Sequence, residues 1–541
     1  MRARVLLAAA LVVLLATVTL DVPEGRVTPL GGRLTEAWAS GDAEIGTFDI
    51  DPGRGLLVAT VYDSASRTRA VAVEMRSGLV RWQATRPGHA LQVRDVHGDT
   101  LILDHVRGLD TVLTGHHMDT GRETWVSVVP YPAEVLAYAD DAVLVSEYAP
   151  SRDGSVGSPS GYRALARATG RVLWRRDVPA GCQEFDGVGN GRVAVLRLTC
   201  ADLTSIIGIR TGDGRELWRH RLGTGLGLWP RLRMTGGVFV ASFDGEVAVY
   251  RDDGRPLVRL TGLDCRHPCH VARVGDLVVL DVSAKDGTAL LTVNVRTGRH
   301  RLITGLPYAF IGFSQRTATD TVLYLQASPL LPLRSFLIVA IDPRDGRRAE
   351  LHLPGRSLTA AHGDLLFTSG RAGFRAYRIG DGGPAWSPLG GVAPRDWPDA
   401  CALLTPEALT RALPGTYDRT SQRQSLGDTR LPAPVRCEYV YRGENAPIVT
   451  VSVVWVARSS ADARTHFADH PEWGYGNAQG RGGIGDEAVF VNDPLARVPT
   501  ERVLLRTGRV LAEVTVIDRP GAATRVAEAV AAGLRRIGPK G

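Results

Sequence analysis

Thr169-Gly170-Arg171-Val172-Leu173-Trp174 is one of eight related turns that recur along this chain. An apolar stretch leads into each turn, a glycine forms it, and in five copies a tryptophan follows that glycine by four residues. The turn glycines are Gly78, Gly121, Gly170, Gly214, Gly254, Gly298, Gly346 and Gly382. Because they are separated by 36 to 49 residues, the chain consists of repeats of one structural unit.

Each repeat holds a second apolar run upstream of its turn, such as residues 101–103 or 193–195. Short apolar runs bounded by turn signals are typical of strands, and a glycine adopts the positive φ of a tight hairpin without a Cβ clash. A repeat of this length fits one four-stranded propeller blade. The sequence therefore predicts a mainly β fold over residues 30–392, an eight-bladed β-propeller, with seven blades as the alternative.

The tryptophans lie on the strand that leaves each turn. One blade alone cannot bury an indole, whereas stacking against the next blade buries roughly 200 Å² of it. We therefore expect packing between blades, rather than stacking on a ligand, for Trp82, Trp125, Trp174, Trp218 and Trp386. Trp38 precedes the first complete repeat, and we expect it on a strand that closes the ring against the last blade.

The unit of a strand followed by (Asp/Thr)-Gly-x-x-x-Trp resembles the repeat of the PQQ-like β-propellers. That family includes quinoprotein alcohol dehydrogenases and the outer-membrane assembly lipoprotein of the Bam complex. The resemblance is weakest at Gly254, Gly298 and Gly346, whose turns lack the tryptophan. Quinoprotein dehydrogenases hold the quinone against a disulfide of two adjacent cysteines, and this chain has no Cys-Cys pair. We therefore expect a propeller without a bound cofactor.

Other candidate chemistry is weaker. Thiolate and imidazole groups in Cys265-Arg-His-Pro-Cys269-His270 are the right ligand types for zinc, but four ligands within six residues are too close together for a tetrahedral site. We expect no metal there. The sequence contains no Gly-x-Ser-x-Gly nucleophile elbow, while a catalytic triad assembled from distant loops stays open.

The N-terminus carries an export signal. Two arginines precede residues 5–20, which contain no charge, and Asp21 ends the run. Sixteen residues span about 24 Å as a helix, slightly less than a hydrocarbon core of about 30 Å. We expect residues 1–24 to be an uncleaved membrane anchor, with a cleaved signal peptide as the alternative. Both place the remaining chain outside the cytoplasm.

The cysteine count agrees with export. An even, locally spaced set in an oxidising compartment indicates disulfides. The spacing indicates three local pairs, namely Cys182 with Cys200, Cys265 with Cys269, and Cys401 with Cys437.

The repeat stops after Trp386, and residues 390–394 read as a linker. Beyond it the patterns predict helices over 399–409, 459–469 and 522–534 and strands over 437–441, 448–455, 503–505 and 510–516. We therefore expect an α+β domain over 397–541. Asp399-Ala-Cys401-Ala-Leu-Leu-Thr, Cys437-x-Tyr439 and Gly483-Ile-Gly-Asp-Glu-Ala resemble the DUF3558-like domains of actinobacterial envelope lipoproteins. The resemblance implies a Cys401–Cys437 bridge and an envelope location, and it brings no catalytic residues.

Composition narrows the function further. The net charge of +7 is spread along the chain without basic runs interleaved with aromatics, which speaks against nucleic-acid binding. All but two of the 64 basic residues are arginines, which indicates a high-GC genome such as that of an actinobacterium. We predict a membrane-tethered extracytoplasmic scaffold, more a binding protein than an enzyme, whose propeller presents loops to an envelope protein or polymer. The alternative is a quinoprotein-type oxidoreductase or an envelope hydrolase, which a buried carboxylate pair in the central channel would favour.

Overall fold

The structure of the 541-residue chain is a computed structural model, and it describes residues 33–537 with gaps. The residues outside the description are 1–32, 41–43, 63–67, 87–88, 150–158, 180–181, 201–202, 225–230, 244, 266–268, 285–286, 307, 330–336, 352–356, 371–372, 381–391, 423–424, 427–428, 444–446, 469–477, 494–497 and 538–541. The expected anchor (1–24), Gly382 and Trp386 lie among them. Within the described part, no helix is both long and apolar enough to cross a bilayer.

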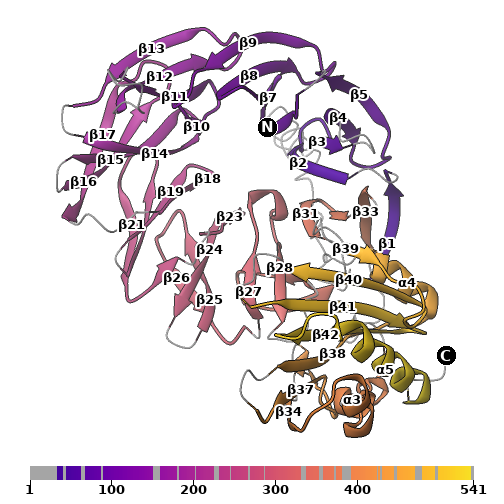
Figure 1. Cartoon of the computed structure of the whole chain (residues 1–541). Coiled ribbons are helices and arrows are strands. Elements are labelled where there is room, and N and C mark those ends of the chain that lie inside the picture. Colours follow the sequence, from indigo (N-terminus) through magenta and orange to yellow (C-terminus); the bar gives the residue numbers. More distant parts are fainter. Residues whose placement is uncertain are drawn as a thin grey trace, which may run out of the picture.

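Eight antiparallel sheets form a closed ring, which confirms the eight-bladed propeller (Figure 1). In the first four blades the strands follow one another from the channel outwards. These blades are β2 (Glu44–Asp51), β3 (Leu56–Tyr62), β4 (Thr68–Glu74) and β5 (Val80–Thr85); β6 (Gln92–His97), β7 (Thr100–Arg107), β8 (Asp110–His117) and β9 (Glu123–Val129); β10 (Val135–Tyr138), β11 (Ala142–Tyr148), β12 (Pro159–Ala166) and β13 (Val172–Asp177); β14 (Cys182–Asn190), β15 (Val193–Cys200), β16 (Leu203–Arg210) and β17 (Glu216–Thr224).

The next three blades keep this order with small changes. They are β18 (Arg231–Thr235), β19 (Val238–Phe243), β20 (Glu246–Arg251) and β21 (Pro256–Thr261); β22 (Asp264–Cys265), β23 (Val271–Val274), β24 (Leu277–Ala284), β25 (Gly287–Asn294) and β26 (His300–Ile303); β27 (Tyr308–Gly312), β28 (Leu323–Pro329), β29 (Leu337–Ile341) and β30 (Arg348–Leu351). In blade 6 the innermost strand is split, since β22 and β23 both pair with β24. In blade 7 a short 3-10 helix, η1 (Gln315–Thr317), follows the innermost strand.

The eighth blade closes the ring with the start of the chain. It consists of β31 (Ser357–His362), β32 (Leu365–Gly370), β33 (Gly373–Gly380) and, as its outermost strand, β1 (Arg33–Ala39). Strand β1 pairs antiparallel with β33, and Trp38 lies opposite Ala376. The closing role expected for the Trp38 strand is therefore confirmed.

Burial explains why the inner strands are continuous apolar runs. Leu57, Val58 and Ala59 on β3 are at most 1% exposed, because the two neighbouring blades cover the two faces of this blade. The outermost strands face solvent instead, and most residues of β13 are exposed. The apolar clusters accordingly join adjacent blades, as the one that contains Trp82, Val93 and Leu103 shows.

The C-terminal domain has its own sheet and core and lies beside the last blade (Figure 1). Its seven-stranded sheet runs in the order β34 (Tyr417–Gln422), β37 (Arg436–Tyr441), β38 (Ile448–Val456), β42 (Val510–Ile517), β41 (Thr500–Thr507), β40 (Glu487–Asp493) and β39 (Ala478–Gly480). The remaining elements are η2 (Pro394–Asp396), α2 (Ala400–Leu403), α3 (Pro406–Ala412), α4 (Ser460–Ala468), α5 (Ala522–Ile537) and the hairpin of β35 (Ser425–Leu426) and β36 (Thr429–Arg430). Helix α5 packs on β41 and β42 through its apolar face.

Candidate functional site

A tryptophan joins each of five blades to the next. The indole of Trp125 lies against Gly170 of the following blade, where a Cβ atom would be 2.6 Å from its ring. Its Nε1–H donates a hydrogen bond to the Arg167 carbonyl, three residues before that glycine (2.8 Å). Trp38, Trp82 and Trp174 make the same pair of contacts. Trp218 packs on Gly254 in the same way but donates to the Asp252 carbonyl, two residues before that glycine, and the N···O distances of these four bonds are 2.5 to 2.9 Å. We call each such arrangement a tryptophan clamp.

Each clamp also depends on a small residue in its own blade. The residue opposite the tryptophan on the third strand is Ala or Gly, and in blades 1 to 4 it stands six positions before the turn glycine. The pairs are Ala72 with Trp82, Gly115 with Trp125, Ala164 with Trp174, Gly208 with Trp218, and Ala376 with Trp38. A Cβ on Gly115 would be 2.0 Å from the Trp125 ring, so the indole fills the space that the small residue leaves. The sequence contains this six-residue spacing between the small residue and the turn glycine, but we did not predict the contact from it.

The last repeats depart from the clamp. Trp386 and Gly382 lie outside the described residues, and Trp38 occupies the place opposite Ala376, six positions before Gly382. At the turn of blade 6, a Cβ atom on Gly298 would lie 2.7 Å from the Leu257 carbonyl oxygen, so a backbone group takes the place of the indole. At the turn of blade 7, Ile303 is the nearest side chain to Gly346, at 3.4 Å from a Cβ placed there.

The central channel widens at one end into a cavity of about 980 Å³. Its lining comes from the ends of the innermost strands of blades 1 to 6 and 8 and from the segment that contains η1. We call this cavity the channel mouth. Since all eight blades contribute to it, the closed ring fixes its shape, and its volume lies at the upper end of the range for ligand pockets.

The η1 segment of blade 7 reaches across the channel mouth. The Gln315 Oε1 atom accepts hydrogen bonds from the Thr235 hydroxyl of blade 5 (2.5 Å) and from the Arg273 amide of blade 6 (2.7 Å). On the other side, Arg316 Nε donates to Asp49 Oδ1 of blade 1 at 2.7 Å. One short segment therefore links blades on both sides of the channel.

Two carboxylates of neighbouring blades lie in the channel mouth, Asp49 on β2 and Asp95 on β6. Asp49 is 8% exposed, and burial raises its pKa, with the nearby Asp95 charge acting in the same direction and Arg316 opposing. Asp95 pairs with Arg167, which is 3% exposed and also donates to the carbonyls of Ala139 and Thr100 at 3.1 and 3.2 Å. Neither residue stood out in the sequence, because the ring alone brings these distant positions together.

These two carboxylates are the kind of pair that would favour a hydrolase. Each of them, however, already holds an arginine, and Asp49 Oδ2 also accepts the Val96 amide at 3.1 Å. A carboxylate that is engaged by a guanidinium and an amide is poorly placed to take a proton from a substrate. The arrangement therefore acts as a set of ties between blades 1, 2, 3 and 7.

The structure contains the three disulfides, Cys182–Cys200, Cys265–Cys269 and Cys401–Cys437. The first joins β14 to β15, the second joins the end of β22 to Cys269, shortly before β23, and the third joins α2 to β37. Among the described residues, no group of three or more His, Cys, Asp and Glu side chains is placed to hold a metal ion. His116 is buried, where its Nδ1 and Nε2 atoms face the Gly121 carbonyl and the Thr114 hydroxyl.

A family model of propeller repeats agrees with this architecture. The family model described as "Outer membrane protein assembly factor BamB" matches residues 109–303 and 162–387. Among solved structures, the chain is similar to BamB from Moraxella catarrhalis, with 16% identity over 65% of this chain and 99% of that chain and a TM-score of 0.38. It is also similar to the WD40 domain of SCAP from fission yeast, with 8% identity over 65% of this chain and 98% of that chain and a TM-score of 0.40. No curated protein matches the chain.

The two family matches together span residues 109–387, which contain the described strands from β8 to β33. Since they cover more than half of the 541 residues, the chain belongs to the PQQ-like propeller-repeat family to which that BamB description refers.

Proposed function

We propose that this protein is a membrane-tethered extracytoplasmic scaffold whose propeller binds an envelope protein at the channel mouth. The single observation that carries this proposal is that both carboxylates of neighbouring blades in the channel mouth are paired with arginines. Asp49 and Asp95 are tied to Arg316 and Arg167, so the cavity presents a fixed polar surface and no free acid or base at these two positions. A preorganised surface favours binding because little entropy is lost when a partner docks.

The framework behind the cavity supports the same function. Five tryptophan clamps and the η1 ties hold the blades in one arrangement, so the turns around the channel mouth keep fixed positions. The family description names an outer-membrane protein assembly factor, which is a role in protein interaction. The expected N-terminal anchor and the DUF3558-like resemblance of the C-terminal domain support the envelope location.

Positional cross-linking in the cells that produce the protein tests the proposal. A photoreactive amino acid is placed at Asn190, which lines the channel mouth, and as a matched control at Leu109, which is 74% exposed. Leu109 lies in the turn between β7 and β8, at the opposite end of the blade from the turns around the channel mouth. We expect one envelope protein to be captured from Asn190 and not from Leu109. Capture of the same proteins from both positions, or from neither, contradicts the proposal.

A further inference from the structure

The junction between blades 6 and 7 lacks a tryptophan clamp and contains a separate cavity of about 500 Å³. Its lining includes Thr292 and Arg301 of blade 6 and Pro343 and Arg344 at the turn of blade 7. We call this cavity the blade 6–7 slot. It shares Asp320 and Thr321 with the channel mouth, so the two hollows adjoin.

The slot lies at the position that corresponds to the indole of the five clamped junctions. Thr292 stands six residues before the turn glycine Gly298, as Gly115 does before Gly121, and its cross-strand partner is Arg301 rather than a tryptophan. Pro343 stands three residues before Gly346, as Arg167 does before Gly170. At four of the five clamped junctions, the carbonyl of that position accepts the indole N–H. The slot therefore keeps two walls of a tryptophan site, the residue opposite the indole and the turn segment that precedes the glycine, whereas Gly346 itself lies against Ile303.

Some charged side chains around the slot have an ion-pair partner, whereas two arginines have none among the described residues. Arg344 is held by Asp342 at 2.7 Å, and Asp276 is held by Arg296 at 3.0 Å. Arg301 donates to the Arg344 carbonyl at 3.2 Å, which brings its guanidinium across the junction. Within the described part of the chain, neither Arg299 nor Arg301 has a carboxylate within salt-bridge distance, and both are exposed. The slot thus offers two arginines to an anionic ligand.

We propose that the blade 6–7 slot binds a peptide segment of the partner protein in which an aromatic side chain is flanked by acidic residues. The aromatic ring fills the place of the missing indole, and a tryptophan would donate its N–H to the Pro343 carbonyl. The flanking carboxylates pair with Arg299 and Arg301, in the bidentate geometry that arginine favours. This inference rests on the proposed scaffold function, which it deepens by naming the chemistry of the partner segment.

Fluorescence anisotropy with a synthetic probe tests the slot without knowledge of the partner. The probe is a nine-residue peptide with a central tryptophan and four Asp or Glu residues on each side, and the full-length protein is titrated into it. We expect the Kd to rise about tenfold or more for Arg299→Glu and for Arg301→Glu, because charge reversal replaces attraction with repulsion. Replacing the probe's tryptophan by alanine is expected to weaken binding by a similar factor.

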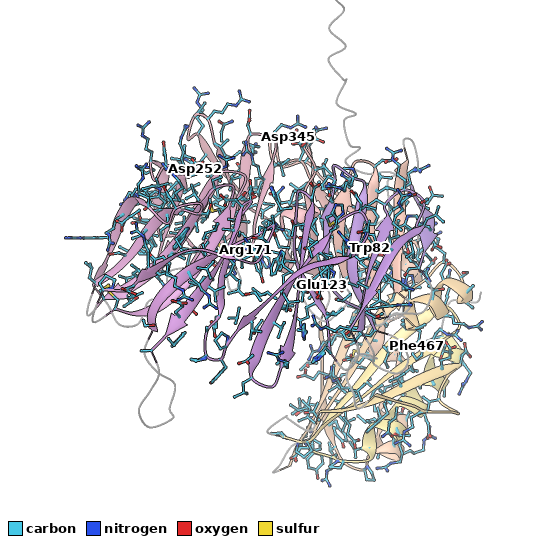
Figure 2. The ribbon with its side chains drawn as sticks, turned by 90° about the horizontal axis from the view of Figure 1, so that it is seen from above. Trp82, Glu123, Arg171, Asp252, Asp345 and Phe467 are labelled. Atoms are coloured by element: carbon cyan, nitrogen blue, oxygen red, sulfur yellow. A yellow bond between two sulfur atoms is a disulfide. The ribbon has the colours of Figure 1, made fainter. Side chains whose placement is uncertain are left out.

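Arg171→Glu is the matched control, because Arg171 follows the turn glycine of blade 3 as Arg299 follows that of blade 6. Figure 2 labels Arg171 on the ring, and its junction carries a clamp. Unchanged binding by this variant supports the slot. The proposal is overturned if the wild type does not bind the probe, if Arg171→Glu weakens binding as much as Arg299→Glu, or if the alanine probe binds equally well. Cross-linking from Asn190 reports on the scaffold function separately, so a failure of the slot and a failure of that function are distinguishable.

Discussion

Adding one methyl group at Gly170 should destabilise the propeller far more than adding the same group at Gly108. Both glycines have φ +67°, a left-handed conformation that costs an alanine about 1 kcal/mol. A Cβ at Gly108 meets nothing within 4 Å, whereas a Cβ at Gly170 would lie 2.6 Å from Cε3 and 2.8 Å from Cδ2 of Trp125. The second variant therefore adds the cost of overpacking, about 1–3 kcal/mol.

We predict that Gly108→Ala lowers the free energy of unfolding by about 1 kcal/mol and Gly170→Ala by about 2–4 kcal/mol. Urea unfolding followed by circular dichroism measures both. Trp125→Ala should cost about 3–5 kcal/mol by itself, since it removes a buried indole and its hydrogen bond. It should also relieve the clash, so the cost of the double variant should fall short of the sum of the single costs by about 1–3 kcal/mol.

The reasoning is refuted if Gly170→Ala and Gly108→Ala are equally destabilising, because the clash with Trp125 would then contribute nothing. Strict additivity of Gly170→Ala and Trp125→Ala would refute it as well. Either result would mean that the clamps are not rigid joints and that the blades can move apart at low cost.

Three further predictions concern other parts of the fold. Replacing both Cys401 and Cys437 by serine opens a loop with a sequence separation of 36 residues, and calorimetry should show the C-terminal domain destabilised by about 4 kcal/mol; an unchanged transition contradicts this. Arg167→Met leaves Asp95 and two carbonyls without their partner, so urea unfolding should show a free energy of unfolding about 3–5 kcal/mol lower than that of the wild type. A decrease below about 1 kcal/mol would show that the Arg167–Asp95 ion pair is dispensable. Burial and nearby arginines lower the pKa of His105 to about 4, so the unfolded chain binds a proton that the folded chain does not, and stability should fall as the pH drops from about 6.5 towards 4. His105→Gln should make this part of the pH dependence disappear, and an identical pH profile for the variant would contradict the assignment.

The repeat predicted the architecture because its signals are local. The glycine turns and the strands on either side of them are set by residues a few positions apart, so the eight blades and the closing role of the Trp38 strand could be foreseen. The channel mouth could not, since Asp49 and Arg316 are 267 residues apart and meet only when the ring closes. The slot could have been suspected from the missing tryptophan after Gly298, but the position of Arg301 opposite Thr292 needed the register of β25 and β26. Trp386 lies outside the described residues, so its packing between blades stays a prediction, while Trp38 stands opposite Ala376 because the N-terminal strand completes the last blade.

The central claim is that the propeller is a scaffold for another protein. Its most direct test is affinity purification of the full-length chain from chemically cross-linked envelopes of its host, followed by mass spectrometry and by absorption and metal analysis of the purified protein. The account predicts that one envelope protein is recovered repeatedly with the chain. Recovery of the chain alone, carrying a chromophore or a metal ion, would contradict the account and favour an enzyme.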